Sequence, residues 1–128
     1  LEIFGVLNYT RGEESELSGV KVPADRIPPL NVRLGLVWEP SDRWRLEPYV
    51  DLAGSQNRLS PRDVEDPRID PTGTDGWATL NLLASWQATQ QTAVGLKLEN
   101  LGDNNYREHG SGIDAAGRNV GLWLNLLF

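Results

Sequence analysis

The chain of 128 residues contains no cysteine and no methionine. Without cysteine, disulfides and thiolate metal sites are excluded. It also lacks the ~20 consecutive apolar residues that a membrane-spanning helix needs, and its mean hydropathy is −0.41. Basic residues are scarce, because 12 Lys and Arg stand against 18 Asp and Glu and the net charge is −6. Nucleic acid is therefore not expected as a partner, since phosphate binding requires a basic surface.

The chain shows no signal peptide and begins at Leu1, so we expect a processed or excised piece of a longer product. Its low mean hydropathy does not exclude a transmembrane β-barrel. Strands of such a barrel give every second residue to a polar lumen, and their average therefore resembles that of a soluble protein.

Alternation of apolar and polar residues is the main feature that is present. It predicts an all-β fold of about six antiparallel strands joined as up-and-down hairpins, without a convincing helix. The expected strands are residues 1–10, 31–38, 44–54, 77–88, 92–101 and 118–128. The connections 39–43 and 89–91 are short, whereas 11–30, 56–76 and 102–117 are long, polar and rich in Gly, Pro and Asp. Short turns at one end and long loops at the other are typical of bacterial outer-membrane barrels.

Charged and apolar residues are expected on opposite faces of these strands. A Lys or Arg on a lipid face near the midplane costs about 2–4 kcal/mol, so a bilayer enforces such segregation. The expected outward residues are Val32, Leu34, Leu36, Leu46, Val50, Leu52, Ala78, Leu80, Leu82, Ala84, Val94, Leu96, Leu98, Leu122, Leu124 and Leu126. The expected lumen-facing polar residues are Arg33, Arg45, Glu47, Tyr49, Asp51, Lys97 and Glu99. Pairing of these side chains with one another across neighbouring strands is a simpler explanation of their presence. Pro48 lies within a strand, and we expect a bulge there.

Aromatic residues distinguish a barrel from a soluble sandwich, which also segregates charge. Trp38, Trp44, Trp86 and Phe128 all fall on the apolar face near the short turns, and Tyr9, Trp77 and Tyr106 lie nearer the long loops. Trp and Tyr favour the boundary between membrane and water. The pattern predicts an aromatic girdle of Trp38, Trp44, Trp86 and Phe128.

The last third of the chain carries a recognisable motif. Asn100 and Leu101 close the strand expected at 92–101, Asp103 and Tyr106 follow it, and Gly117 and Arg118 open the last strand. This stretch resembles the end of TonB-dependent outer-membrane receptors, as do residues 26–30 and 68–77 upstream, although Asp75 stands where the family often has proline. We interpret the motif as barrel-rim architecture, because Asn100 and Asp103 tolerate left-handed backbone and Gly117 permits a turn.

The resemblance implies that residues 1–128 are the carboxy-terminal part of a barrel of about 22 strands whose plug domain and earlier strands are absent. The full receptor would lie in the outer membrane of a Gram-negative bacterium. It would contact lipid and import a ferric siderophore, haem or similar bulky nutrient with energy from TonB, ExbB and ExbD. The plug and the TonB-contacting segment are not in this chain, so it cannot perform energised transport alone.

The terminal strand is implied to carry a signal for the barrel assembly machinery, formed by Asn119, Gly121, Leu124, Leu126 and Phe128. The isolated chain is expected to self-associate, because about six strands leave two open edges.

Other candidate sites have simpler interpretations. His109 is the only histidine, and we interpret it as a solvated loop residue and not as a metal or haem ligand. The acidic run Asp63, Glu65, Asp66, Asp70 and Asp75 alternates with Arg58, Arg62 and Arg68, which favours a solvated, salt-bridged loop over a calcium site. No catalytic constellation is present, so we expect neither an enzyme nor a metal or other cofactor. Two alternatives stay open: a small outer-membrane barrel or adhesin, and a soluble β-sandwich binding module.

Overall fold

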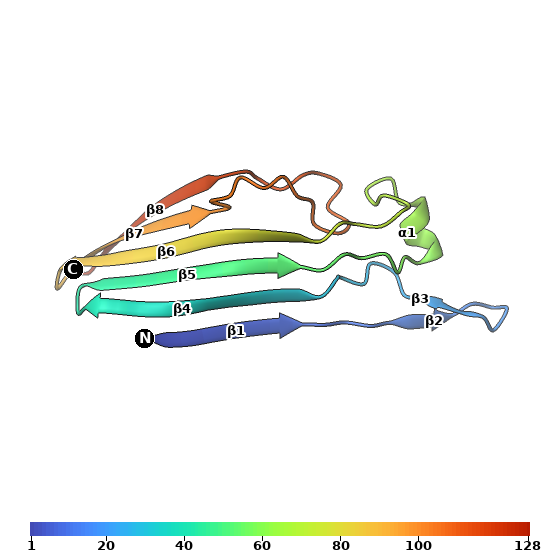
Figure 1. Ribbon diagram of the computed structural model, residues 1–128, viewed down its shortest axis with the longest axis horizontal. Coiled ribbons are helices and arrows are strands. Elements are labelled where there is room, and N and C mark those ends of the chain that lie inside the picture. Colours follow the sequence, from blue (N-terminus) through green and yellow to red (C-terminus); the bar gives the residue numbers. More distant parts are fainter.

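The computed structural model describes all residues from Leu1 to Phe128. One antiparallel sheet dominates it, and its six strands follow each other in chain order (Figure 1). A small hairpin is inserted between the first two strands of this sheet, and one short helix follows the third. The sheet contains β1 (Glu2–Asn8), β4 (Asn31–Ser41), β5 (Trp44–Ala53), β6 (Trp77–Thr89), β7 (Thr92–Glu99) and β8 (Asn119–Leu126); the hairpin is β2 (Glu13–Ser15) with β3 (Lys21–Pro23), and the helix is α1 (Pro61–Glu65). The predicted all-β hairpin fold is confirmed.

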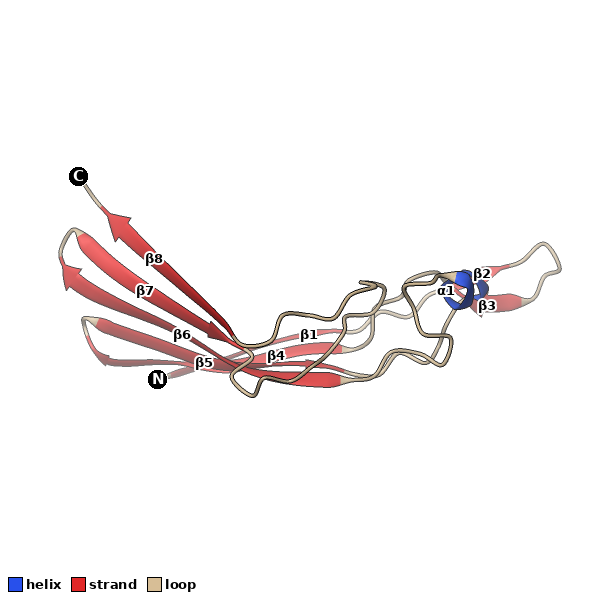
Figure 2. Cartoon of the chain, turned by 90° about the horizontal axis from the view of Figure 1, so that it is seen from above, coloured by secondary structure: helices blue, strands red, loops and turns tan.

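The two ends of the sheet differ. Both termini and the two short turns, after β4 and after β6, lie at one end, while the long connections extend beyond the other end (Figure 1). The β2–β3 hairpin and α1 are the parts farthest from the sheet, and the sheet itself is bent across its width (Figure 2). The outer strands β1 and β8 each have one neighbour in this sheet, so both edges are open.

Register places all apolar rows on one face. Leu46 pairs with Ala84, Ala84 with Leu96, and Leu96 with Leu122, which puts these side chains in one row across four strands. Directly paired residues share a face in antiparallel sheets. We call the surface made by these rows the leucine face and the opposite surface the polar face. The leucine face of the paired strands carries Ile3, Leu7, Val32, Leu34, Leu36, Leu46, Val50, Leu52, Leu80, Leu82, Val94, Leu96, Leu98, Val120, Leu122, Leu124 and Leu126 with no charged residue among its paired positions.

The leucine face is exposed. Leu80 is 50% and Leu122 is 75% accessible, whereas Thr79 and Asn81 on the polar face are only 5% and 3% accessible. Water-soluble monomers rarely expose a continuous apolar surface of this kind. This sheet therefore has no hydrophobic core of its own on the leucine side. No helix of the chain has the length and apolar character needed to cross a membrane.

Three local expectations are wrong. The sequence predicted no helix, but residues 61–65 form helix α1. Ser60 caps this helix, Pro61 opens it and Asp63 completes a capping box. The expected bulge at Pro48 is absent, since Pro48 pairs in register with Leu82, and the irregularity of β4–β5 falls between Trp38 and Ser41. The strand expected to reach Phe128 ends at Leu126, which pairs with Thr92, the first residue of β7.

One glycine is required by close approach of a neighbour. Gly95 in β7 is buried and pairs with Trp123 in β8 on the polar face. A Cβ atom at Gly95 would overlap the indole ring of Trp123. The missing side chain therefore makes the room that this ring occupies between two neighbouring strands.

Candidate functional site

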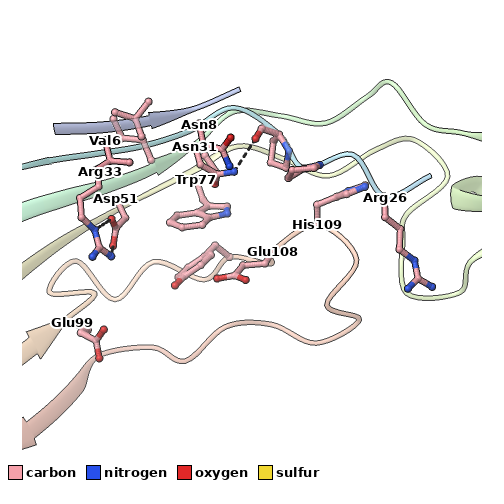
Figure 3. A pocket seen from close by; sticks show the side chains of 16 residues that line it. Val6, Asn8, Arg26, Asn31, Arg33, Asp51, Trp77, Glu99, Glu108 and His109 are labelled. Atoms are coloured by element: carbon pink, nitrogen blue, oxygen red, sulfur yellow. Dashed lines mark hydrogen bonds and ion pairs between the residues drawn. The ribbon is translucent and has the colours of Figure 1, made fainter. Parts of the chain in front are cut away.

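A hollow of about 500 Å³ lies on the polar face where the sheet meets the long loops (Figure 3). Strands β1, β4, β5 and β6 and the last residue of β7 form its floor, and residues from two of the long connections form its walls. Because alternate residues of a strand point to the same side, the polar rows of neighbouring strands converge here. Its charged and aromatic lining residues are Arg26, Arg33, Asp51, Trp77, Glu99, Tyr106, Glu108 and His109.

The floor carries a fixed ion pair. Arg33 Nε donates to Asp51 Oδ1 at 2.6 Å and Nη2 donates to Oδ2 at 2.9 Å, which is the bidentate geometry preferred by guanidinium and carboxylate groups. The guanidinium also lies 4.6 Å from the ring centroid of Tyr49, and the Asn81 amide lies 3.4 Å from Asp51. The pair is therefore held from several sides, and it leaves little free charge on the floor.

The remaining predicted lumen charges pair locally. Arg45 bonds Glu47 at 2.6 Å, and Lys97 lies 2.7 Å from Glu99, each within one strand. Arg33–Asp51 joins two neighbouring strands, as mutual pairing predicts. Ion pairs that are open to solvent contribute little to stability. All these residues share the polar face, so the pairs neutralise that face without supplying a nucleophile or a general base.

Trp77 lies in the hollow (Figure 3), and its ring packs against that of Tyr106 in a tilted arrangement, with ring centroids 4.2 Å apart. Trp77 pairs with Ala53 on the polar face, which brings its ring to the side of the sheet opposite the leucines. Both residues lie at the long-loop end, as the sequence pattern predicts, but the Trp77 ring is not on the leucine face. Burial raises the pKa of the Tyr106 phenol, and the nearby Glu108 carboxylate raises it further. The hollow thus combines an aromatic wall with the exposed carboxylate of Glu108, which forms no ion pair.

His109 is not the solvated residue that its sequence context suggested. Its Nδ1 lies 2.8 Å from Thr74 Oγ1, which joins the last long loop to the loop before β6. Its Nε2 is buried without a hydrogen-bond partner. Burial lowers the pKa of the imidazole, so the neutral form is favoured at physiological pH. No group of three potential metal ligands includes it.

The motif after β7 builds the rim of the sheet. Asn100 and Asp103 both adopt left-handed backbone, with φ of 50° and 55°. The buried Asn100 amide donates to the carbonyl of Asn104 at 2.8 Å, and its side-chain oxygen accepts from the Asn104 N–H at 2.9 Å. Asn81 Oδ1 accepts the Asn100 N–H at 2.9 Å. Asn100 therefore closes the turn by which the chain leaves β7.

The other motif residues complete this rim. Asp103 Oδ1 accepts the N–H of Arg118 at 3.1 Å, which ties the beginning of the loop to its end. A Cβ atom at Gly117 would lie 2.8 Å from Asp103 Oδ1, so glycine is needed for this close approach. The Leu101 N–H donates to the carbonyl of Leu80 at 2.9 Å, while Tyr106 turns into the hollow. The motif thus has a structural role in the isolated chain.

Tryptophans mark one level of the leucine face at the short-turn end. Trp44 and Trp86 pair across β5 and β6, and their rings stack with centroids 6.0 Å apart. With Trp38 they are 39–50% accessible. Phe128 lies beyond the end of β8 and is fully exposed. The sheet brings the three tryptophans together but leaves Phe128 outside the described strand pairing.

The acidic run does not converge on a cation site. Asp66 pairs with both Arg26 and Arg68, and these guanidinium groups hold the pKa of its carboxyl well below the usual range, with Arg68 contributing most. This agrees with a salt-bridged loop. Asp63 differs, because it is only 2% accessible and accepts hydrogen bonds from the backbone of two different loops.

The sequence did not indicate Arg26 and Glu108 as residues that line the hollow. The Arg-Ile-Pro-Pro-Leu stretch marked residue 26 only as the opening of a strand.

No family model and no curated relative matches the chain. Solved structures do. The copper transporter OprC superposes with a TM-score of 0.82 at 22% identity, over 98% of this chain and 20% of that one. The ferric-catecholate import receptor Fiu from E. coli K12 superposes with a TM-score of 0.68 at 16% identity, over 98% of this chain and 18% of that one. The chain thus spans about a fifth of each of these proteins and shares the fold of that part of them.

Proposed function

We propose that the chain is the carboxy-terminal part of the barrel of an outer-membrane receptor that imports a scarce metal complex, such as a ferric siderophore or haem, with energy from TonB. The protein is a transporter and not an enzyme. Its place is the outer membrane of a Gram-negative bacterium, with lipid against the leucine face and the charged rows towards the lumen.

The observation that carries this proposal is the uncovered leucine face. Six strands present apolar rows with no charge at any paired position, and all charged rows lie on the other face. In water such a surface is a liability, whereas in a bilayer it is the stable arrangement. The fold similarity to a copper transporter and a ferric-catecholate import receptor supports the same reading.

The hollow supplies a ligand surface in this proposal. It faces the lumen side at the long-loop end, which is the outer side in barrels with short periplasmic turns. The Trp77–Tyr106 pair offers flat aromatic surface, and Glu108 offers a carboxylate without an ion-pair partner. The aromatic pair suits a planar part of the ligand, and the carboxylate can accept hydrogen bonds from it.

Open edges support the remaining partners. β1 and β8 each leave one row of backbone N–H and C=O groups without a strand partner. Lipid cannot satisfy these groups, so β1 and β8 would pair with further strands of the barrel or, in the isolated chain, with other copies. The barrel assembly machinery would recognise the last strand, β8. Four residues of the expected signal lie within it: Asn119, Gly121, Leu124 and Leu126.

The proposal is tested in a Gram-negative host that lacks its own ferric-complex receptors. The native gene product is expressed with and without TonB, and cells are supplied with radiolabelled iron(III) as a catecholate complex and, separately, with copper(II). We expect the protein in the outer-membrane fraction and accumulation of one of these probes only when TonB is present. Recovery of the protein in the soluble fraction would contradict the proposal.

A labelling experiment tests which face meets lipid. Single cysteines at Leu96 and Lys97, neighbours on opposite faces of β7, are exposed to a membrane-impermeant thiol reagent in outer-membrane vesicles. Only the cysteine at Lys97 should react, because the other lies on the lipid side. Equal labelling at both positions would refute the orientation.

A further inference from the structure

The connection before β4 and the connection after β5 are joined far from the sheet. We call residues 9–30 the first loop and residues 54–76 the second loop. Arg58 Nη1 donates to the carbonyl of Gly12 at 3.1 Å, and Gln56 Nε2 donates to the carbonyl of Ile27 at 2.8 Å. Both bonds connect a side chain of the second loop to backbone of the first. The two loops therefore pack as one body beside the hollow.

Asp63 is the centre of this junction. Its carboxylate accepts the Arg26 N–H at 3.0 Å and 3.3 Å through its two oxygens, and it accepts the Ser60 N–H at 3.0 Å. Arg26 belongs to the first loop, and Asp63 and Ser60 belong to the second. A carboxylate that accepts several backbone N–H groups forms strong, charge-assisted hydrogen bonds. One side chain thus fixes backbone of both loops at once.

Burial strengthens this junction. Asp63 is 2% accessible and Ser60 is fully buried. The Ser60 hydroxyl accepts the Asp63 N–H at 3.0 Å, so Ser60 and Asp63 are bonded to each other in both directions. Water cannot replace these bonds easily at a buried site, so loss of the carboxylate leaves N–H groups without partners.

Arg26 is held in a conformation that arginine rarely adopts. Its φ is 50°, in the left-handed region, which is unusual for a residue with a long side chain. Such outliers persist only when the surroundings fix them, and they concentrate at functional sites. Arg26 lines the hollow (Figure 3), and its guanidinium pairs with Asp66 at 3.0 Å. The strained residue is therefore both bonded to Asp63 and placed at the candidate ligand surface.

We propose that Asp63 is a positioning residue: it joins the first and second loops into one unit and thereby holds Arg26 at the wall of the hollow. The consequence for ligand binding rests on the proposed transport function, whereas the joining of the loops does not. The last loop is connected to this unit by the hydrogen bond between Thr74 and His109.

The test compares Asp63→Asn with Glu65→Gln in the native gene product, reconstituted in lipid vesicles. Glu65 lies in the same helix but is exposed and makes no hydrogen bond through its carboxylate. Amide hydrogen exchange is measured for residues 24–28 and for β5 and β6. In Asp63→Asn, exchange at residues 24–28 should accelerate about 10- to 100-fold, the effect of losing hydrogen bonds to a charged group. Glu65→Gln should leave it unchanged, and β5 and β6 should stay protected in both variants.

Binding of an iron(III)–catechol complex provides the second readout. Asp63→Asn should raise the half-saturating concentration while the number of sites stays the same, and Glu65→Gln should change neither. If no variant binds this probe, the proposed ligand class fails, yet hydrogen exchange still decides the role of Asp63. If Asp63→Asn does not fold, Ser60→Ala replaces it, with an expected acceleration of about fivefold. Unchanged exchange at residues 24–28 in the folded variant would overturn the proposal.

Discussion

A charge placed on the leucine face should destabilise the protein far more than the same charge one residue along. Leu82 and Leu83 are neighbours in β6 and lie on opposite faces. Leu82 pairs with Pro48 and Leu98, and no paired position on that face offers a carboxylate. An arginine there costs about 2–4 kcal/mol at the bilayer midplane, which lowers the folding equilibrium constant about 30- to 700-fold.

The matched control is Leu83→Arg. Leu83 pairs with Glu47 on one side and with Lys97 on the other, so one favourable and one unfavourable charge pair oppose each other. Cross-strand pairs contribute about 0.2–1 kcal/mol each, and the net change should stay within about 1 kcal/mol. Both variants are measured by urea unfolding in lipid vesicles, with the midpoint and slope compared to the parent protein.

A third variant separates lipid from a protein core. Leu126 pairs with Thr92 at the short-turn end, beyond the level of Trp44 and Trp86. An arginine near the membrane interface costs only about 0–1 kcal/mol, so Leu126→Arg should be mild although it also lies on the leucine face. A buried protein core has no such dependence on depth. Equal losses for Leu82→Arg and Leu83→Arg, or a Leu126→Arg loss as large as that of Leu82→Arg, would refute the reasoning.

Three further predictions concern single residues. Gly95→Ala should destabilise the protein by about 1–3 kcal/mol, because the added methyl group overlaps the Trp123 ring. Gly121→Ala should be nearly neutral, because a Cβ there meets only Lys97 Cβ at 3.6 Å. The midpoints of urea unfolding compare the two variants. Burial lowers the pKa of His109 in the folded protein, so the unfolded loop binds the proton more readily. The packing of residues 105–116 should therefore be complete above about pH 6.5 and should weaken as the pH falls. Amide hydrogen-exchange protection factors, corrected for intrinsic exchange, should lose this pH dependence in His109→Gln. Removal of Phe128 should reduce the amount of receptor in outer-membrane fractions on quantitative blots without changing ligand affinity in the molecules that insert, and normal abundance would contradict an assembly role.

The sequence by itself determined the sheet. Because side chains alternate strictly along a strand, the pattern of leucines and charges fixed the strands, their faces and their antiparallel order. It also identified Asn100 and Asp103 as left-handed positions, since the short polar side chains of Asn and Asp bond their own backbone. These features depend on near neighbours in the chain and on a period of two.

Tertiary structure alone decided the site. The Trp77–Tyr106 ring contact, the Thr74–His109 bond and the burial of Asp63 against Arg26 connect residues that are 29, 35 and 37 positions apart, and no local pattern specifies them. Strand register first brings the loop ends to one edge of the sheet, and packing among the loops then selects which side chains meet. An acidic residue in a polar run therefore looked solvated in the sequence, and only the fold showed it to be the buried acceptor that holds two loops together.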